Sequence, residues 1–227
     1  MLKSIKTSVV ALILVSTAII VHAQKKISEG TITYGLEYKL TDEQKSALGG
    51  QELPAEVKVK FNNGLTKIEM EQGPAMISII SDNNQKTGLI LVDVPIAQKQ
   101  YAVKQSKEDV ETALAGMGKF SDFKATGEKQ TIAGYSAEKY TYKDDKGGAH
   151  ELWATKDVDL PNTGTQTYFP GLAAFPVKYT MVQRGIETVN TLKAINEAKV
   201  GAISSAVPAG YEETTMQALM SMGGGGE

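Results

Sequence analysis

The chain of 227 residues contains no cysteine, a single arginine (Arg184) and two histidines. Without cysteine, no disulfide can crosslink the fold, so its stability must come from a packed core. Cysteine and histidine supply most zinc ligands, and the usual zinc sites therefore cannot be assembled. Bidentate clamps for phosphate or carboxylate groups use arginine, so a dedicated anion site is not expected. We expect neither a metal nor a cofactor.

The chain also lacks an apolar run of the roughly 20 residues that a membrane-spanning helix needs. Residues 7–21 form a shorter apolar stretch, which follows Lys3 and Lys6 and precedes Ala23. Positive residues, an apolar stretch and small residues near a cleavage point are the three parts of a secretory signal peptide. We expect residues 1–23 to be a signal peptide cleaved after Ala23, which leaves a soluble periplasmic or secreted protein without a transmembrane anchor. The alternative is an uncleaved N-terminal anchor.

Strong charge of one sign and catalytic motifs are missing as well. The formal net charge of −2 gives no basic footprint, so we expect no nucleic-acid partner. His150 is the one histidine after residue 23, and a lone strand histidine is more often a surface residue than a catalytic base. The motifs of serine nucleophiles are absent. Asp82-Asn83-Asn84 and Asp144-Asp145 are typical of Asx-type turns rather than calcium loops. We assign no catalytic residue and expect a protein that is not an enzyme.

What the sequence has in abundance is period-two alternation of apolar and polar residues, the pattern of half-buried strands. Asn63-Gly64 between two such segments predicts a tight hairpin turn, because both residues tolerate positive φ. The predicted strands lie at 32–40, 57–61, 65–70, 75–81, 87–93, 101–103, 139–143, 150–154, 177–181 and 187–198. We expect a mainly β (α+β) fold with a curved antiparallel sheet of about ten or eleven strands.

Two or three short helices accompany the predicted sheet. Thr41 and Gln44 have the spacing of a capping box, which predicts a helix over 42–48. Ser106 can cap a helix over 107–117, and residues 213–222 form a third amphipathic segment. Proline and glycine make residues 159–176 an ordered loop or a helical turn. Since no linker divides the chain, we expect one domain over residues 24–222 and a flexible glycine-rich tail over residues 223–227.

Three segments resemble a known family of exported Gram-negative proteins that is grouped as a domain of unknown function. They are Thr126-Gly127 with Ile132-Ala133-Gly134-Tyr135 and Lys139-Tyr140, then Glu151-Leu152-Trp153-Ala154-Thr155, and Val207-Pro208-Ala209-Gly210-Tyr211. Such proteins look like relatives of the LolA/LolB-like lipoprotein-carrier fold. The resemblance implies a half-barrel whose helices act as plug or lid over an apolar cavity that takes up acyl chains. Arg184, in a predicted turn, does not match the inward-facing arginine of true carriers, so the broader expectation is a lipid or another apolar ligand.

We therefore expect a periplasmic binding or carrier module for a lipid-like or other apolar small molecule. Two alternatives stay open: a ligand-free module that docks an envelope protein partner, and a hydrolase that uses paired carboxylates. Flexible methionines in the last helix suit an adaptable apolar surface, although core packing is the commoner role. The apolar residues predicted to line the ligand cavity are Tyr34, Leu36, Val59, Phe61, Ile68, Ile79, Leu91, Tyr101, Tyr140, Trp153, Tyr179, Met181, Met216 and Met220.

Overall fold

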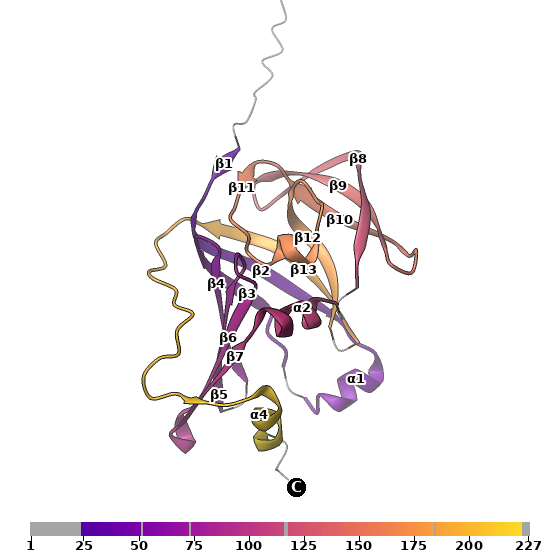
Figure 1. The fold of residues 1–227 in the computed structure, drawn as a ribbon. Helices are drawn as coiled ribbons and strands as arrows, with labels where there is room; N and C mark the ends of the chain where they lie inside the picture. Colours follow the sequence, from indigo (N-terminus) through magenta and orange to yellow (C-terminus); the bar gives the residue numbers. More distant parts are fainter. Residues whose placement is uncertain (1–23, 51, 73, 116–117, 184, 224–227) are drawn as a thin grey trace, which may run out of the picture.

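The structure is a computed structural model that describes residues 24–50, 52–72, 74–115, 118–183 and 185–223, with the side chains of residues 72, 220, 222 and 223 left aside. The predicted signal peptide, Arg184 and the tail from residue 224 lie outside these residues. A sheet of twelve strands dominates the described chain, in the order β14-β7-β6-β5-β4-β3-β2-β13-β12-β10-β9-β8 (Figure 1). The expectation of a mainly β fold built on a large curved sheet is confirmed.

The strands of this sheet are β2 (Glu29–Lys39), β3 (Glu56–Asn62), β4 (Leu65–Gln72), β5 (Ala75–Asp82), β6 (Thr87–Val94), β7 (Lys99–Gln105), β8 (Phe120–Ile132), β9 (Tyr135–Asp144), β10 (Ala149–Thr155), β12 (Phe175–Gln183), β13 (Ile186–Asn196) and β14 (Glu212–Glu213). A separate parallel pair joins β1 (Lys25–Lys26) to β11 (Val158–Asp159). The main sheet is antiparallel except where β14 runs parallel to β7. The strand count of ten or eleven was therefore too low. The predicted set lacks the irregular strand β8, and it lacks β1, β11 and β14, because two-residue strands carry no alternation.

Four short α-helices and one 3-10 turn, η1 (Pro95–Ala97), complete the described part of the chain, against the two or three helices predicted. The helices are α1 (Asp42–Ala47), α2 (Lys107–Ala115), α3 (Thr165–Tyr168) and α4 (Met216–Gly223). The last helix begins three residues later than predicted and includes Gly223, which the sequence analysis placed in the tail. The helix expected over residues 107–117 is present over Lys107–Ala115, and residues 116–117 lie outside the described part.

Local signals explain where these elements begin and turn. The capping box of α1 is formed, since the Thr41 hydroxyl accepts from the Gln44 amide and the Gln44 side chain accepts from the Thr41 amide. The hairpin between β3 and β4 turns through Asn63 and Gly64, whose φ values are +50° and +92°. Asp82 accepts two backbone hydrogen bonds, from Asn84 and Gln85, as an Asx-type turn does.

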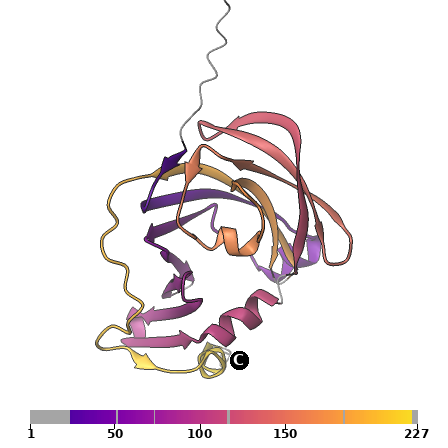
Figure 2. The same ribbon diagram turned by 45° about the horizontal axis from the view of Figure 1, so that its top comes forward.

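The concave side of the sheet holds the main core. Pairing across the strands places Val59, Ile68 and Ile79 on one face, and this face looks toward α3 and the loops around it. Figure 2 shows α3 inside the curve of the sheet. Phe169, which follows α3, is 1% exposed, and Phe61 is fully buried in the same cluster. The interior of this half of the sheet is therefore filled by the chain itself.

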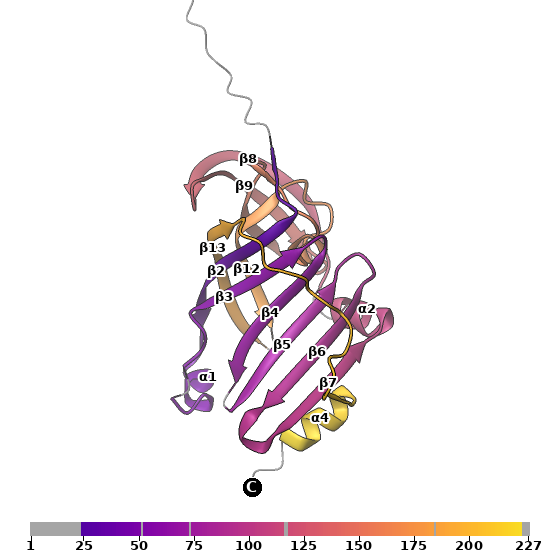
Figure 3. The same ribbon diagram turned by 90° about the vertical axis from the view of Figure 1, so that its left-hand side faces the viewer.

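The convex side of strands β4–β7 carries a second, smaller apolar cluster. Ile80, Leu89, Leu91 and Ala102 are buried there beneath residues 197–211, an extended segment that we call the strap. Figure 3 shows the strap crossing the strands from β13 toward β7. Its start is fixed by the Glu29 carboxylate, which accepts from the amides of Val200 and Gly201.

The sheet splits between β10 and β12. These strands pair only where Trp153, Ala154 and Thr155 meet residues 175–178, with a register shift after Trp153. Over Ala149–Leu152, β10 keeps its pairing with β9 but has left β12. The β9–β10 hairpin therefore diverges from the end of β12, and the opening between them is called the wedge from here on.

The longest strand, β8, was absent from the sequence prediction. It shows no regular alternation of burial, since ten of the thirteen residues along Phe120–Ile132 are exposed and one, Ile132, is buried. Two register shifts interrupt its pairing with β9, and Asp122 and Gly127 have positive φ. Such bulges erase the period-two signal on which a strand prediction depends.

Candidate functional site

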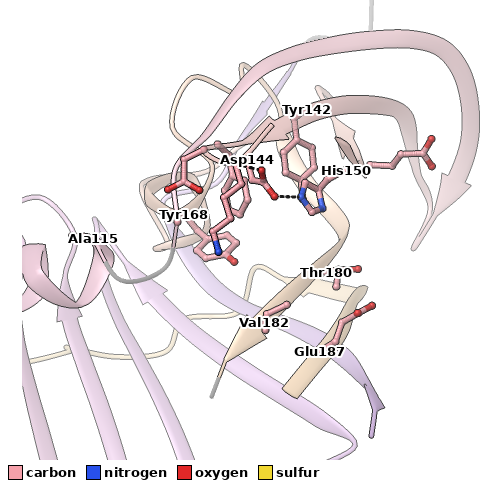
Figure 4. Close-up of a pocket in the computed structure, with 13 residues that line it drawn as sticks. Ala115, Tyr142, Asp144, His150, Tyr168, Thr180, Val182 and Glu187 are labelled. Carbon is pink, nitrogen blue, oxygen red and sulfur yellow. Dashed lines mark hydrogen bonds and ion pairs between the residues drawn. The ribbon is translucent and has the colours of Figure 1, made fainter. Parts of the chain in front are cut away.

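The wedge contains an open pocket of about 600 Å³ (Figure 4). The β9–β10 hairpin forms one side of the pocket, the ends of β12 and β13 form the other, and the last residue of α2 closes a third. Its lining residues are Ala115, Gly118, Phe120, Tyr142, Asp144, Asp145, Lys146, His150, Glu151, Tyr168, Thr180, Val182 and Glu187.

Aromatic rings form the apolar wall of the pocket. Phe120 lies edge-on to Tyr142 at 5.2 Å between ring centroids and to Tyr168 at 5.3 Å. Phe169 supports this wall from the core, with centroids 5.7 Å from Tyr142 and 4.8 Å from Tyr168. The wall is rigid because its rings are held in edge-to-face contacts that continue into the main core.

A histidine–aspartate pair lies at the rim. The Nε2 atom of His150 is 2.7 Å from Oδ2 of Asp144, and the His150 ring stacks on Tyr142 at 5.4 Å between centroids. Oδ1 of Asp144 accepts from the amides of Lys146 and Gly148, so one carboxylate closes the hairpin turn and orients the histidine. The hydrogen bond with His150, followed by those from the turn amides, holds the pKa of Asp144 below its ordinary value.

The hydroxyl of Tyr142 is a polar group at the pocket wall that no described residue satisfies. Tyr142 is 3% exposed, and its hydroxyl forms no hydrogen bond with another described residue. Among the described residues, every fully buried side-chain oxygen or nitrogen has a hydrogen-bond partner, so the Tyr142 hydroxyl is not fully buried. Tyr142 is also among the residues that line the pocket. Burial raises the pKa of Tyr142, with further contributions from Tyr168 and Asp144, so the group is a neutral phenol that can donate or accept.

Charged side chains surround the pocket mouth. Glu151 forms an ion pair of 2.9 Å with Lys139, and Glu187 one of 2.5 Å with Lys39. Asp145 and Lys146 form no ion pair with the residues that the structure describes. Among the described residues, the rim thus combines carboxylates with one lysine next to the aromatic wall.

The chemistry of this arrangement is better suited to binding than to a catalytic triad. His150 is oriented by Asp144, but among the hydrogen bonds of the described residues no hydroxyl or thiol contacts its ring. A nucleophile activated by histidine needs such a contact. Across the described ranges, no group of three His, Cys, Asp or Glu side chains is placed to hold a metal ion.

The residues that the sequence analysis chose as ligand lining lie elsewhere. Five of them are buried in the main core, where they contact other side chains: Tyr34, Val59, Phe61, Tyr140 and Tyr179. Leu36, Ile68, Trp153 and Met181 are partly buried against that core. Ile79 and Tyr101 are half-buried on the inner face of β5 and β7, and Met216 is half-buried in α4.

Two of the chosen residues need separate mention. Leu91 lies on the convex face under the strap, where it lines a second cavity of about 330 Å³. The side chain of Met220 is outside the described residues. None of the other chosen residues lines the wedge pocket, so a role of the chosen set in ligand binding stays a prediction.

The sequence around Asp144, Asp145 and His150 predicts a turn and a surface histidine. The turn is confirmed, and it is also what brings His150 onto the same carboxylate. The signal that could have found the pair is its spacing, because an acid before a tight turn and a histidine just after it meet across a hairpin. The partners from β12 and β13 carry no such signal.

Comparison with known proteins gives one finding about this chain. A protein family described as "Domain of unknown function (DUF4412)" matches residues 44–168, more than half of the sequence. No curated protein matches the chain. The matched segment begins in α1 and ends with α3, so it includes the aromatic wall and the His150–Asp144 pair, whereas β12 and β13 follow it.

Proposed function

The chain belongs to the DUF4412 family, and we propose that it is a binding or carrier module for a lipid-like, amphipathic ligand in the periplasm. The observation that carries the proposal is the open pocket of about 600 Å³ in the wedge, with an aromatic wall and a polar rim. Pockets for small molecules have volumes of roughly 300–1,000 Å³ and combine apolar walls with a few polar groups.

The division of the pocket into an apolar and a polar side favours an amphipathic occupant. Phe120 and Tyr168 offer ring surface, and Val182 is a large apolar side chain that is 59% exposed at the pocket edge. Covering such surface is favourable by about 25 cal/mol for each Å² removed from water. Asp144, His150 and the Tyr142 hydroxyl provide polar contacts for a head group.

The carrier part of the proposal includes the half-barrel and the export route. A curved sheet around the internal helix α3 is compatible with a half-barrel of the lipoprotein-carrier type. Among the described residues, no helix combines the length and apolarity needed to cross a bilayer. Release into the periplasm after cleavage behind Ala23 belongs to the same proposal, and N-terminal sequencing of the protein from its own envelope tests it.

The binding proposal is tested by native mass spectrometry of protein purified from its own envelope and by uptake of a fluorescent fatty-acid probe. We expect bound lipid and saturable uptake, and we expect Val182→Asp to weaken uptake roughly tenfold by placing a charge on the apolar edge. Ile96→Asp is the matched control, because Ile96 is 86% exposed and lies outside the pocket. A ligand-free mass together with no uptake would overturn the proposal.

A second candidate, docking of an envelope protein, is favoured by the edge strand β8. Among the described strands only β9 pairs with it, so its outer edge is open to a strand from a partner. A photocrosslinking residue in place of Thr126, with Lys26 as control position, tests this in intact cells. A discrete adduct from position 126 and not from position 26 supports docking. If no adduct forms while lipid uptake is normal, docking is rejected and the binding function stands.

A further inference from the structure

We propose that the wedge pocket selects ligands whose polar head carries a positive charge, such as an alkylammonium group. This inference rests on the proposed binding function and specifies the ligand class of the same pocket. Three observations carry it: the sign of the lining charges, the occupation of the turn amides by a carboxylate of the protein, and the phenol of Tyr142, which forms no hydrogen bond with another described residue.

The lining charges are predominantly negative. Among the described residues, four carboxylates line the pocket, Asp144, Asp145, Glu151 and Glu187, together with one lysine, Lys146. Glu151 and Glu187 are paired with lysines that do not line the pocket, and Asp145 forms no ion pair with the described residues. A cleft lined by one sign of charge raises the local concentration of the opposite sign.

The backbone donors of the hairpin turn, which could otherwise bind an anion, are already taken. The amides of Lys146 and Gly148, which a tight turn presents to solvent, both donate to Oδ1 of Asp144. An anionic head group would have to compete with this carboxylate, whose charge would also repel it. The turn is thus an anion site that the protein fills for itself.

The aromatic wall supplies what a cation needs. Ring faces attract cations, and this attraction is stronger where the site is desolvated. Tyr142 contributes more than a ring, because its residue is 3% exposed and its hydroxyl meets no described partner. The neutral phenol oxygen can accept from an ammonium group held between Tyr142 and Asp144, both of which line the pocket.

Calorimetric titration with three amphiphiles that share a decyl chain tests the inference: decylammonium, decyl maltoside and decanoate, each below its micellar concentration. We expect the ammonium compound to bind roughly tenfold more tightly than the other two, and added salt to reduce this preference. The double variant Asp145→Asn/Glu187→Gln should reduce the preference at least threefold. Asp122→Asn is the matched control, because Asp122 is an exposed acid on β8 that does not line the pocket.

The outcomes separate the inference from the function beneath it. If none of the three amphiphiles binds, the proposed binding function fails. If decanoate or the maltoside binds as tightly as the ammonium compound, binding stands and the inference about charge is wrong. A preference for the cation that Asp145→Asn/Glu187→Gln leaves unchanged also overturns the inference, since the selectivity would then arise outside the pocket.

Discussion

Replacing Phe169 with alanine tests whether the aromatic wall of the pocket is anchored in the core. Phe169 follows α3, is 1% exposed and contacts rings from four other elements or loops. Its centroid lies 5.4 Å from Tyr179 on β12 and 5.6 Å from Phe120 on β8. Because β12 forms one side of the wedge and β8 pairs with the hairpin on the other side, Phe169 contacts both sides.

The size of the effect follows from burial and from the ring contacts. Truncating a fully buried phenylalanine to alanine lowers the free energy of unfolding by about 3–5 kcal/mol, since apolar contacts are lost and a cavity remains. Phe169→Leu keeps most of the apolar volume but loses the edge-to-face contacts, so a loss of about 1–2 kcal/mol is expected. The total free energy of unfolding of a protein is typically about 5–15 kcal/mol. The alanine variant should therefore be severely destabilised but still folded, so that its unfolding can be measured.

Urea denaturation followed by fluorescence is the assay. Trp153 is the only tryptophan of the chain, and it is partly buried against the core cluster that contains Phe169. The exposed control Ile96→Ala should stay within about 0.5 kcal/mol of the unmodified protein. If Phe169→Ala lowers the unfolding free energy by less than about 1 kcal/mol with an unchanged slope, the ring does not anchor the wall and the reasoning is refuted.

Two further predictions concern turns. Gly64→Ala and Gly134→Ala both place a side chain at strongly positive φ (+92° and +85°), which should cost about 1–2 kcal/mol each in urea denaturation. Gly64→Ala should lose more unfolding free energy than Gly134→Ala, because its new Cβ would lie 2.4 Å from Asn84 Nδ2, whereas a Cβ at Gly134 meets nothing within 4 Å. If Gly134→Ala is as stable as the unmodified protein, the strain argument is wrong. The hydrogen bond with His150 lowers the folded-state pKa of Asp144 from its ordinary 3.8, so its contribution to stability is present above that value and is lost as the pH falls below it. Urea midpoints measured from about pH 5 to about pH 3 should therefore fall less steeply for Asp144→Asn than for the unmodified protein, and parallel curves would disprove this linkage.

Much of the fold could be predicted because its signals are local. The capping box at Thr41, the cap at Ser106 and the Asn63-Gly64 turn each act within four residues, and each is present in the structure. Alternation located the strands from β2 to β7 because one of their faces is buried. In β8 that condition fails, since the strand is exposed on both faces and bulged twice, and its partner β9 is specified only by the fold.

The site was missed for a related reason. Choosing large apolar residues as ligand lining selects the residues that the chain buries first, and Tyr34, Phe61 and Tyr179 are accordingly in the core. A binding pocket needs surface that folding leaves uncovered, and in this protein such surface arises where two strands stop pairing. The residues around Trp153 do not predict that β10 stops pairing with β12 there. Strand pairing depends on both strands and on α3, which lies between them in the sequence.

The split in the sheet also explains why polar and aromatic groups meet in one place. If β10 stayed paired with β12 along its whole length, His150 and Thr180 would lie within a continuous sheet and no pocket would separate them. The insertion of α3 and Phe169 against Tyr142 supports the hairpin in its divergent position, so the same ring that completes the core also keeps the wedge open. Stability and ligand access are therefore coupled at Phe169. Phe169→Leu should weaken uptake of the fluorescent fatty-acid probe more than its small loss of stability alone would suggest. Ile96→Ala should change neither probe uptake nor stability.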